Sequence, residues 1–70
     1  HAIFEVEVPE EWIGKTVGGL DIRKRYNINI LAVKKEGEFT ISISPDTYFE
    51  ENNKLLVLGE YRDLQKCFRI

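Results

Sequence analysis

The chain has 70 residues, of which 43% are apolar and 31% charged, and its formal net charge is -2. A chain of this length forms one small domain that buries only about 60% of its unfolded surface, so pairing with a second copy would stabilise it. The composition is that of a folded chain rather than a disordered one, and the small net charge provides no general attraction to nucleic acid or to an anionic membrane.

Few residues are available for covalent chemistry. Cys67 is the only cysteine, which excludes an intrachain disulfide and a two-cysteine metal motif and favours a reducing cytoplasm. The only histidine is His1, at the terminus, and no nucleophile with a neighbouring base is visible. No apolar run approaches the ~20 residues of a membrane-spanning helix. We therefore predict that the domain is not an enzyme and does not insert into a membrane.

The first third of the chain predicts a strand followed by a short helix. Apolar and acidic residues alternate over Ala2–Val8, which is typical of a half-buried strand that Pro9 ends. Trp12 follows in a turn and is expected to pack as an anchor. Thr16 can cap a helix of one or two turns, which would end near the basic triplet 23–25.

The middle of the chain predicts a hairpin. Over Ile28–Lys34 the alternation would place Ile28, Ile30 and Ala32 on one face. A polar connection that contains a glycine then leads to a further strand, Phe39–Ile43.

The last third predicts a turn, a strand and a helix. Proline and aspartate in the segment 44–47 favour a turn, after which Tyr48 and Phe49 are expected to enter the core. The apolar run Lys54–Gly59 is typical of a strand buried on both faces, and Tyr61–Phe68 has helical spacing. The whole pattern predicts an α+β domain with a small mixed sheet, in the order strand, helix, three strands, helix.

Two charged regions could bind a ligand. Glu5, Glu7 and the acidic pair 10–11 could hold a divalent cation, although a plain solvated surface explains them better. Around Arg23 and Asn29, a guanidinium and an amide could bind a small anion. The competing explanation is that the basic triplet complements the helix dipole. One basic cluster in an acidic chain does not indicate nucleic-acid binding, and the glycines do not form a dinucleotide-binding loop.

Several motifs together resemble those of a known family. The turn Gly14-Lys15-Thr16, the run Leu20-Asp21-Ile22-Arg23, the loop 44–47 and the strand 55–59 resemble the TrkA-C domain, the C-terminal domain of regulators of potassium conductance (RCK). The likeness extends over most of the chain and is greatest to cytosolic regulatory subunits of Ktr-type bacterial potassium transporters. It implies that residues 1–70 are one such domain, a fragment of a subunit whose N-terminal Rossmann-type nucleotide-binding domain lies outside this sequence.

The resemblance also implies a ligand and its contacts. In the Ktr-type members, two copies pair about a two-fold axis and hold one cyclic di-AMP between them, so that every contact is made twice. Here an apolar floor would meet the adenines, Arg23 would face a phosphate, and Asp21 and Asn29 would form hydrogen bonds. The implied site residues are Val17, Asp21, Ile22, Arg23, Asn29, Ile30 and Pro45.

The resemblance finally implies a biological setting. The domain would be a cytoplasmic homodimer without a cofactor, peripheral to the membrane through a potassium channel subunit that its full-length ring contacts. Cyclic di-AMP would act as a regulatory ligand that lowers potassium uptake. Two alternatives remain open, namely a dimerisation module that binds no ligand, and a regulatory domain that binds a divalent cation.

Overall fold

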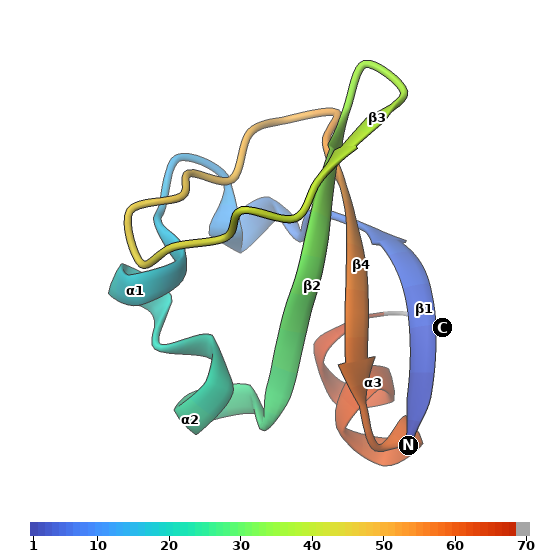
Figure 1. Ribbon diagram of the computed structural model, residues 1–70. Helices are drawn as coiled ribbons and strands as arrows, with labels where there is room; N and C mark the ends of the chain where they lie inside the picture. The colour runs from blue at the N-terminus through green and yellow to red at the C-terminus, as the bar shows by residue number, and fades with distance from the viewer. Residues whose placement is uncertain (69–70) are drawn as a thin grey trace.

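The computed structural model describes residues 1–68, which form one sheet with helices packed against it (Figure 1). The elements, in chain order, are β1 (Ala2–Glu7), the 3-10 helix η1 (Glu10–Trp12), α1 (Val17–Leu20), α2 (Ile22–Tyr26), β2 (Ile28–Lys35), β3 (Glu38–Thr40), β4 (Lys54–Gly59) and α3 (Tyr61–Cys67). The α+β class and the order of the elements are as predicted.

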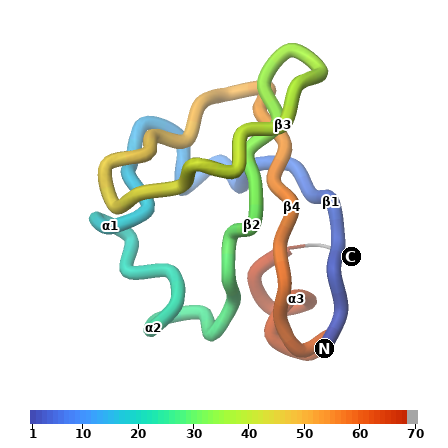
Figure 2. The backbone as a smooth tube through the Cα atoms, viewed as in Figure 1, coloured from blue at the N-terminus to red at the C-terminus, as the bar shows by residue number. Residues whose placement is uncertain are grey.

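The sheet is antiparallel throughout the described strands, so the prediction of a mixed sheet is wrong. The strand order is β1-β4-β2-β3, and β4 pairs antiparallel with both of its neighbours. β1 and β2 therefore run in the same direction, but β4 lies between them and they form no parallel pair (Figure 2). The insertion of the last strand is what removes the parallel pairing.

β2 contains a bulge that changes which residues face the core. Its pairing with β4 shifts between Ile30, opposite Val57, and Ala32, opposite Leu56. Because directly opposed residues point to the same face, Ile30 and Val33 share the face of the buried β4 residues, and Ala32 faces the other way. The predicted simple alternation is thus correct up to Ile30 and wrong beyond it.

The core lies between one face of the sheet and the helices. Trp12 is 2% exposed and contacts three other aromatic rings, with centroid distances of 5.5 Å to Tyr26, 5.2 Å to Phe49 and 5.5 Å to Phe68. Leu64 of α3 is fully buried in the same cluster. The predicted role of Trp12 as a packing anchor is confirmed.

The opposite face of the sheet has no helix packed on it among the described residues. On β4, Leu55 and Val57 are fully buried, whereas Leu56 and Leu58 are half-buried. The prediction that this strand is buried on both faces is therefore wrong for the single chain. We call this surface the open face; it carries Ile3, Asn29, Ala32, Phe39, Leu56 and Leu58 together with the charged residues Glu5, Glu7, Lys34 and Lys54.

Two further expectations differ from the structure in residues 39–49. β3 ends at Thr40 rather than continuing to Ile43, and Ile41 is 79% exposed. Phe49 enters the core as predicted, but Tyr48 is exposed. In residues 1–68 no helix has the length and apolar character needed to cross a membrane.

Candidate functional site

Two local features, the conformation of Gly14 and the cap at Thr16, determine where α1 begins. Gly14 adopts a left-handed conformation with φ of +81°, which a residue without a side chain adopts at no steric cost. The hydroxyl oxygen of Thr16 then accepts a hydrogen bond of 3.0 Å from the Gly19 N–H and caps α1, as predicted. α1 thereby begins at Val17.

A loop that is distant in the sequence is bonded to the start of α1. The Val17 N–H donates to the Thr47 carbonyl and the Gly18 N–H donates to the Pro45 carbonyl, each at 2.9 Å. In Figure 1 this loop runs from β3 across β2 to reach α1. The fold therefore brings Val17 and Pro45, two of the predicted site residues, to one place.

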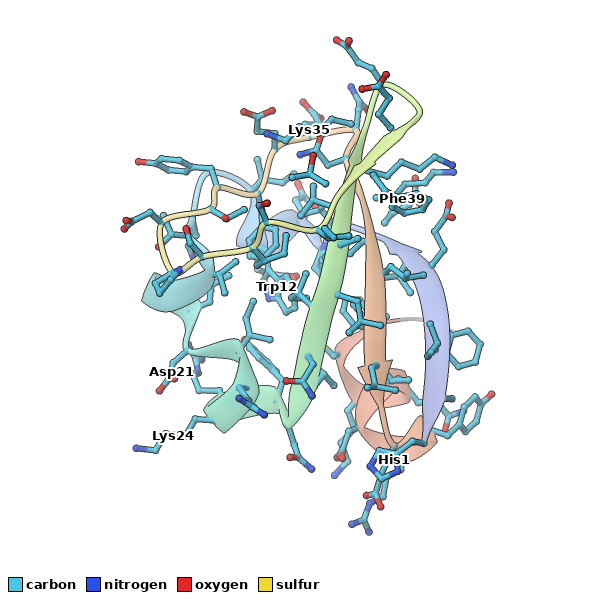
Figure 3. All side chains as sticks on the ribbon, viewed as in Figure 1. His1, Trp12, Asp21, Lys24, Lys35 and Phe39 are labelled. Carbon is cyan, nitrogen blue, oxygen red and sulfur yellow. The ribbon has the colours of Figure 1, made fainter. Side chains whose placement is uncertain are left out.

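The predicted single helix is two helices that meet at Asp21. This residue has φ of 51° and ψ of 50°, a left-handed conformation that aspartate tolerates better than most residues, and α2 starts directly after it. Its side chain makes no capping hydrogen bond. Figure 3 shows Asp21 pointing away from the body of the domain, so its carboxylate is available to an external group.

The basic triplet lies at the C-terminal end of α2. Arg25 stacks on Tyr26, with its guanidinium carbon 5.4 Å from the ring centroid, and Lys24 extends into solvent in Figure 3. No ion pair of Arg23 is found within residues 1–68. Arg23 is exposed and directly follows the αL residue Asp21 and Ile22. All three cations of the triplet are exposed, and of these only Arg25 stacks on an aromatic ring within residues 1–68.

The remaining predicted residues do not all face the same way. Ile22 is 2% exposed and belongs to the core, and Ile30 is half-buried against the core. Asn29, half-buried, lies opposite Leu58 on the open face. Of the seven predicted residues, one chain therefore brings Val17 and Pro45 together at the start of α1 and leaves Asp21 and Arg23 exposed, while Asn29 projects from the other face of β2.

Two hollows in the surface of residues 1–68 lie elsewhere. One is lined by parts of β1, the η1 region and the end of α3, and the other by residues around Glu7, Ile13 and Asn53. Neither is lined by any of the seven predicted residues.

β2 has a partly open edge beside the predicted residues. β3 pairs only with Val33, Lys34 and Lys35, so within the described part of the chain the stretch Ile28–Leu31 has β4 on one side and no strand on the other. Asn29 and Ile30 lie in this stretch.

The structure gives little support to the acidic patch as a cation site. The Glu5 carboxylate lies 3.7 Å from the Lys34 ammonium and 3.9 Å from that of Lys54. Its charge is thus already balanced by two lysines. Across residues 1–68, no group of three acidic, histidine or cysteine side chains is placed to hold a metal ion.

Cys67 shows the character of a packed thiol rather than a reactive one. It is half-buried on α3 and packs against the core. Burial, with a smaller contribution from the negative charge of Glu11, raises its pKa from 9.0 to about 11. The thiol is protonated at neutral pH, which matches the interpretation from the sequence.

An open antiparallel sheet with helices on one face is the architecture of the C-terminal domains of RCK proteins, and solved structures of that class superpose closely. The chain is 38% identical to the RCK C domain of the potassium transport protein KtrA in complex with cyclic di-AMP, covering 94% of this chain and 78% of that one with a TM-score of 0.86. It is 25% identical to the RCK_C domain dimer of S. agalactiae BusR in complex with the same ligand, covering 96% and 90%, with a TM-score of 0.79.

The TrkA-C domain family model matches residues 1–70, and the chain belongs to this family. Among curated proteins, it is 36% identical over 64 residues to the K(+)/H(+) antiporter subunit KhtT of Bacillus subtilis (strain 168), covering 90% of this chain. The match spans 39% of that relative's length, so the chain corresponds to well under half of it. TrkA-C is not an enzyme family, in line with the prediction from the sequence.

Proposed function

We propose that this domain binds cyclic di-AMP at a homodimer interface and regulates a potassium transport system. The observation that supports it most is the likeness to the KtrA RCK C domain, which was solved in complex with cyclic di-AMP and is 38% identical over 94% of this chain. The BusR domain dimer in complex with the same ligand adds a second solved example.

The contacts of the proposed site follow from the chemistry of the ligand. Val17 and Pro45, which lie on two hydrogen-bonded segments, would offer apolar groups to the face of an adenine, while Ile22 and Ile30 are packed in and against the core. The guanidinium of Arg23, which has no ion pair within residues 1–68, suits a phosphate, to which it can donate two parallel hydrogen bonds. The exposed Asp21 carboxylate accepts from the adenine amino group and repels the carbonyl oxygen of a guanine.

A second copy completes the site in this proposal. Asn29 and Ile30 point to opposite faces of β2, and the open edge at Ile28–Leu31 leaves room for another chain to approach. A two-fold symmetric ligand on a two-fold interface receives each contact twice. A site that is shallow in one chain can in this way become strong in the pair.

Regulation requires that the ligand prefers one of two states of the whole subunit. We propose that cyclic di-AMP binding stiffens the domain pair in the cytoplasm and, through the rest of the subunit, acts on a membrane channel subunit to lower potassium uptake. A ligand with equal affinity for both states would shift nothing, so this coupling needs differential binding.

The binding stoichiometry and the effect of removing the Arg23 charge test the proposal. Calorimetry with cyclic di-AMP should give one ligand per two chains. Arg23→Ala should weaken binding by roughly 1.5–3 kcal/mol, because a hydrogen bond to a charged group is lost. The matched control is Arg62→Ala, since Arg62 is an exposed arginine on α3 whose only ion pair in the described chain is with Glu60. One ligand per chain, or equal effects of the two variants, would contradict the shared site.

A dimerisation module without a ligand is the second candidate, and the open face is what favours it. Half-buried Leu56 and Leu58 together with exposed Ile3 and Phe39 form an apolar surface that pairing could cover. This candidate predicts a melting temperature that rises with protein concentration and does not respond to cyclic di-AMP. A response to the ligand would exclude it.

A further inference from the structure

Gly18 lies where another residue would not fit. A Cβ atom on Gly18 would be 2.8 Å from the Cβ of Pro45, 3.0 Å from its carbonyl oxygen and 3.2 Å from its Cα. Two of these three atoms belong to the backbone, which cannot rotate away as the end of a long side chain could. Any side chain at position 18 would push the Pro45 loop away from α1.

The loop is held at this distance by several hydrogen bonds. Besides the bonds from Val17 and Gly18, the Gly14 N–H donates to the Phe49 carbonyl at 2.8 Å, and the Phe49 N–H donates to the Lys15 carbonyl at 2.9 Å. Phe49 is fully buried against Trp12. The loop is therefore anchored to the core on one side of Pro45.

The loop is also braced internally. The Ser44 N–H donates to the Thr47 hydroxyl at 3.0 Å, and the Asp46 N–H donates to the Ser44 hydroxyl at 3.2 Å. The Thr47 N–H donates to the Ser44 carbonyl at 3.1 Å. Pro45 is exposed at the apex of the loop; its ring restricts its backbone angle φ, and these hydrogen bonds fix its position.

The same bonds leave the start of α1 with no free donors for a phosphate. The N–H groups of Val17, Gly18 and Gly19 are all used, by Thr47, Pro45 and the Thr16 hydroxyl respectively. The start of α1 thus serves to hold the loop, and what it offers a ligand is the apolar surface of Val17 beside Pro45.

We propose that Gly18 is a positioning residue of the cyclic di-AMP site. By carrying no side chain, it lets Pro45 pack against α1, so that Pro45 and Val17 form a prebuilt apolar wall for the face of a purine base. A wall assembled before binding spares the ligand the entropy of ordering a loop. This inference rests on the proposed function and adds to it a residue that does not itself touch the ligand.

Gly18→Ala in the 70-residue chain tests the inference by calorimetry with cyclic di-AMP. Displacing the wall removes part of the apolar contact in each copy, so we expect a loss of about threefold per copy and about tenfold per shared ligand. The matched control is Gly37→Ala in the hairpin between β2 and β3. Gly37 has φ of +84°, and no other residue lies within 4 Å of the point that a Cβ would occupy, so alanine strains the backbone there without touching the loop. Gly37→Ala should lower the melting temperature and leave the affinity unchanged.

The salt dependence of binding separates positioning from a general loss of structure. Gly18→Ala removes an apolar contact, so its affinity should fall with added salt as steeply as that of the wild type. Arg23→Ala removes a charge contact, so its affinity should depend less on salt. A variant that had merely loosened the whole fold would lose both kinds of contact together.

Each outcome has a defined meaning. If folded Gly18→Ala binds cyclic di-AMP as tightly as the wild type, or if Gly37→Ala weakens binding equally, the inference is overturned and the proposed function stands. If the wild type itself does not bind, the proposed function fails and the inference with it. If Gly18→Ala does not fold, Thr47→Val replaces it, because this change removes the acceptor of the Ser44 N–H without adding a clash. Weaker binding by Thr47→Val would support the prebuilt wall, and unchanged binding would overturn it.

Discussion

The two faces of β4 differ although each carries two large apolar residues. Leu55 and Val57 are fully buried under the helices, while Leu56 and Leu58, one residue further along each time, are half-buried on the open face. The first pair holds the domain together, and the second pair contributes little to one chain alone. An apolar run can thus serve the fold on one side and, in the proposed dimer, an assembly on the other.

The largest effect should come from truncating the covered face. Leu55→Ala leaves a cavity in a closely packed core and should lower the free energy of unfolding by about 2–5 kcal/mol. Leu56→Ala is the matched control and should lower it by about 1 kcal/mol or less in a monomeric chain, because the side chain is only half-buried. Urea unfolding at low protein concentration measures both. Equal losses would mean that a second copy already covers the open face.

The reactivity of the Cys67 thiol measures how well the core side of the sheet is covered, without any substitution in the core. Because its pKa is raised from 9.0 to about 11, its alkylation by iodoacetamide at pH 8 should be at least about tenfold slower in the folded chain than in urea. As the pH rises from about 9 toward about 11, the unfolded chain loses this proton first, so folding stability falls over that window. Cys67→Ala should remove this part of the pH dependence. Fast alkylation of the folded chain would contradict the packed thiol.

Replacing Asn29 by alanine should have the smallest effect on folding stability and still weaken the binding of cyclic di-AMP. No hydrogen bond of its side chain is found within residues 1–68, so Asn29→Ala should change the unfolding free energy by less than about 0.5 kcal/mol. Binding of cyclic di-AMP should nevertheless weaken by about 1 kcal/mol per copy, which is about 2 kcal/mol per shared ligand, because one hydrogen bond is lost in each copy. A variant that is less stable but binds normally would place Asn29 in the fold rather than in the site.

Much of the fold is accessible from local patterns in the sequence. The alternation over Ala2–Val8 and the cap at Thr16 are decided by near neighbours, and both are confirmed. The burial of Trp12 is confirmed too, because a large aromatic residue in a small domain rarely stays exposed, although its partners are distant in sequence. The position of β4 between β1 and β2 is not accessible in this way, since it depends on contacts between distant segments. The helix break at Asp21 is also missed, although aspartate is a poor residue for a helix interior and tolerates the left-handed conformation found there.

The candidate site shows the same division. The basic triplet is visible in the sequence, but singling out Arg23 needs the family resemblance, and in the structure Arg25 is stacked on Tyr26. The meeting of Val17 with Pro45 is a tertiary contact that spacing cannot indicate. The role of Gly18 is not predicted either, although two adjacent glycines in a helical segment are a signal, because glycine weakens a helix and is present there for a reason other than helix formation.

The bulge in β2 has a consequence for comparing related sequences. Beyond Ile30 the strand presents Val33 to the core only because one extra residue, Leu31, is accommodated between the two registers. A relative with one residue fewer at this point could have the same amino acids after it, yet every later side chain of the strand would point to the opposite face. Alignments of this family should therefore hold the residue count across Ile30–Val33 constant, and a gap placed there signals either a misaligned hairpin or a member with a different open face.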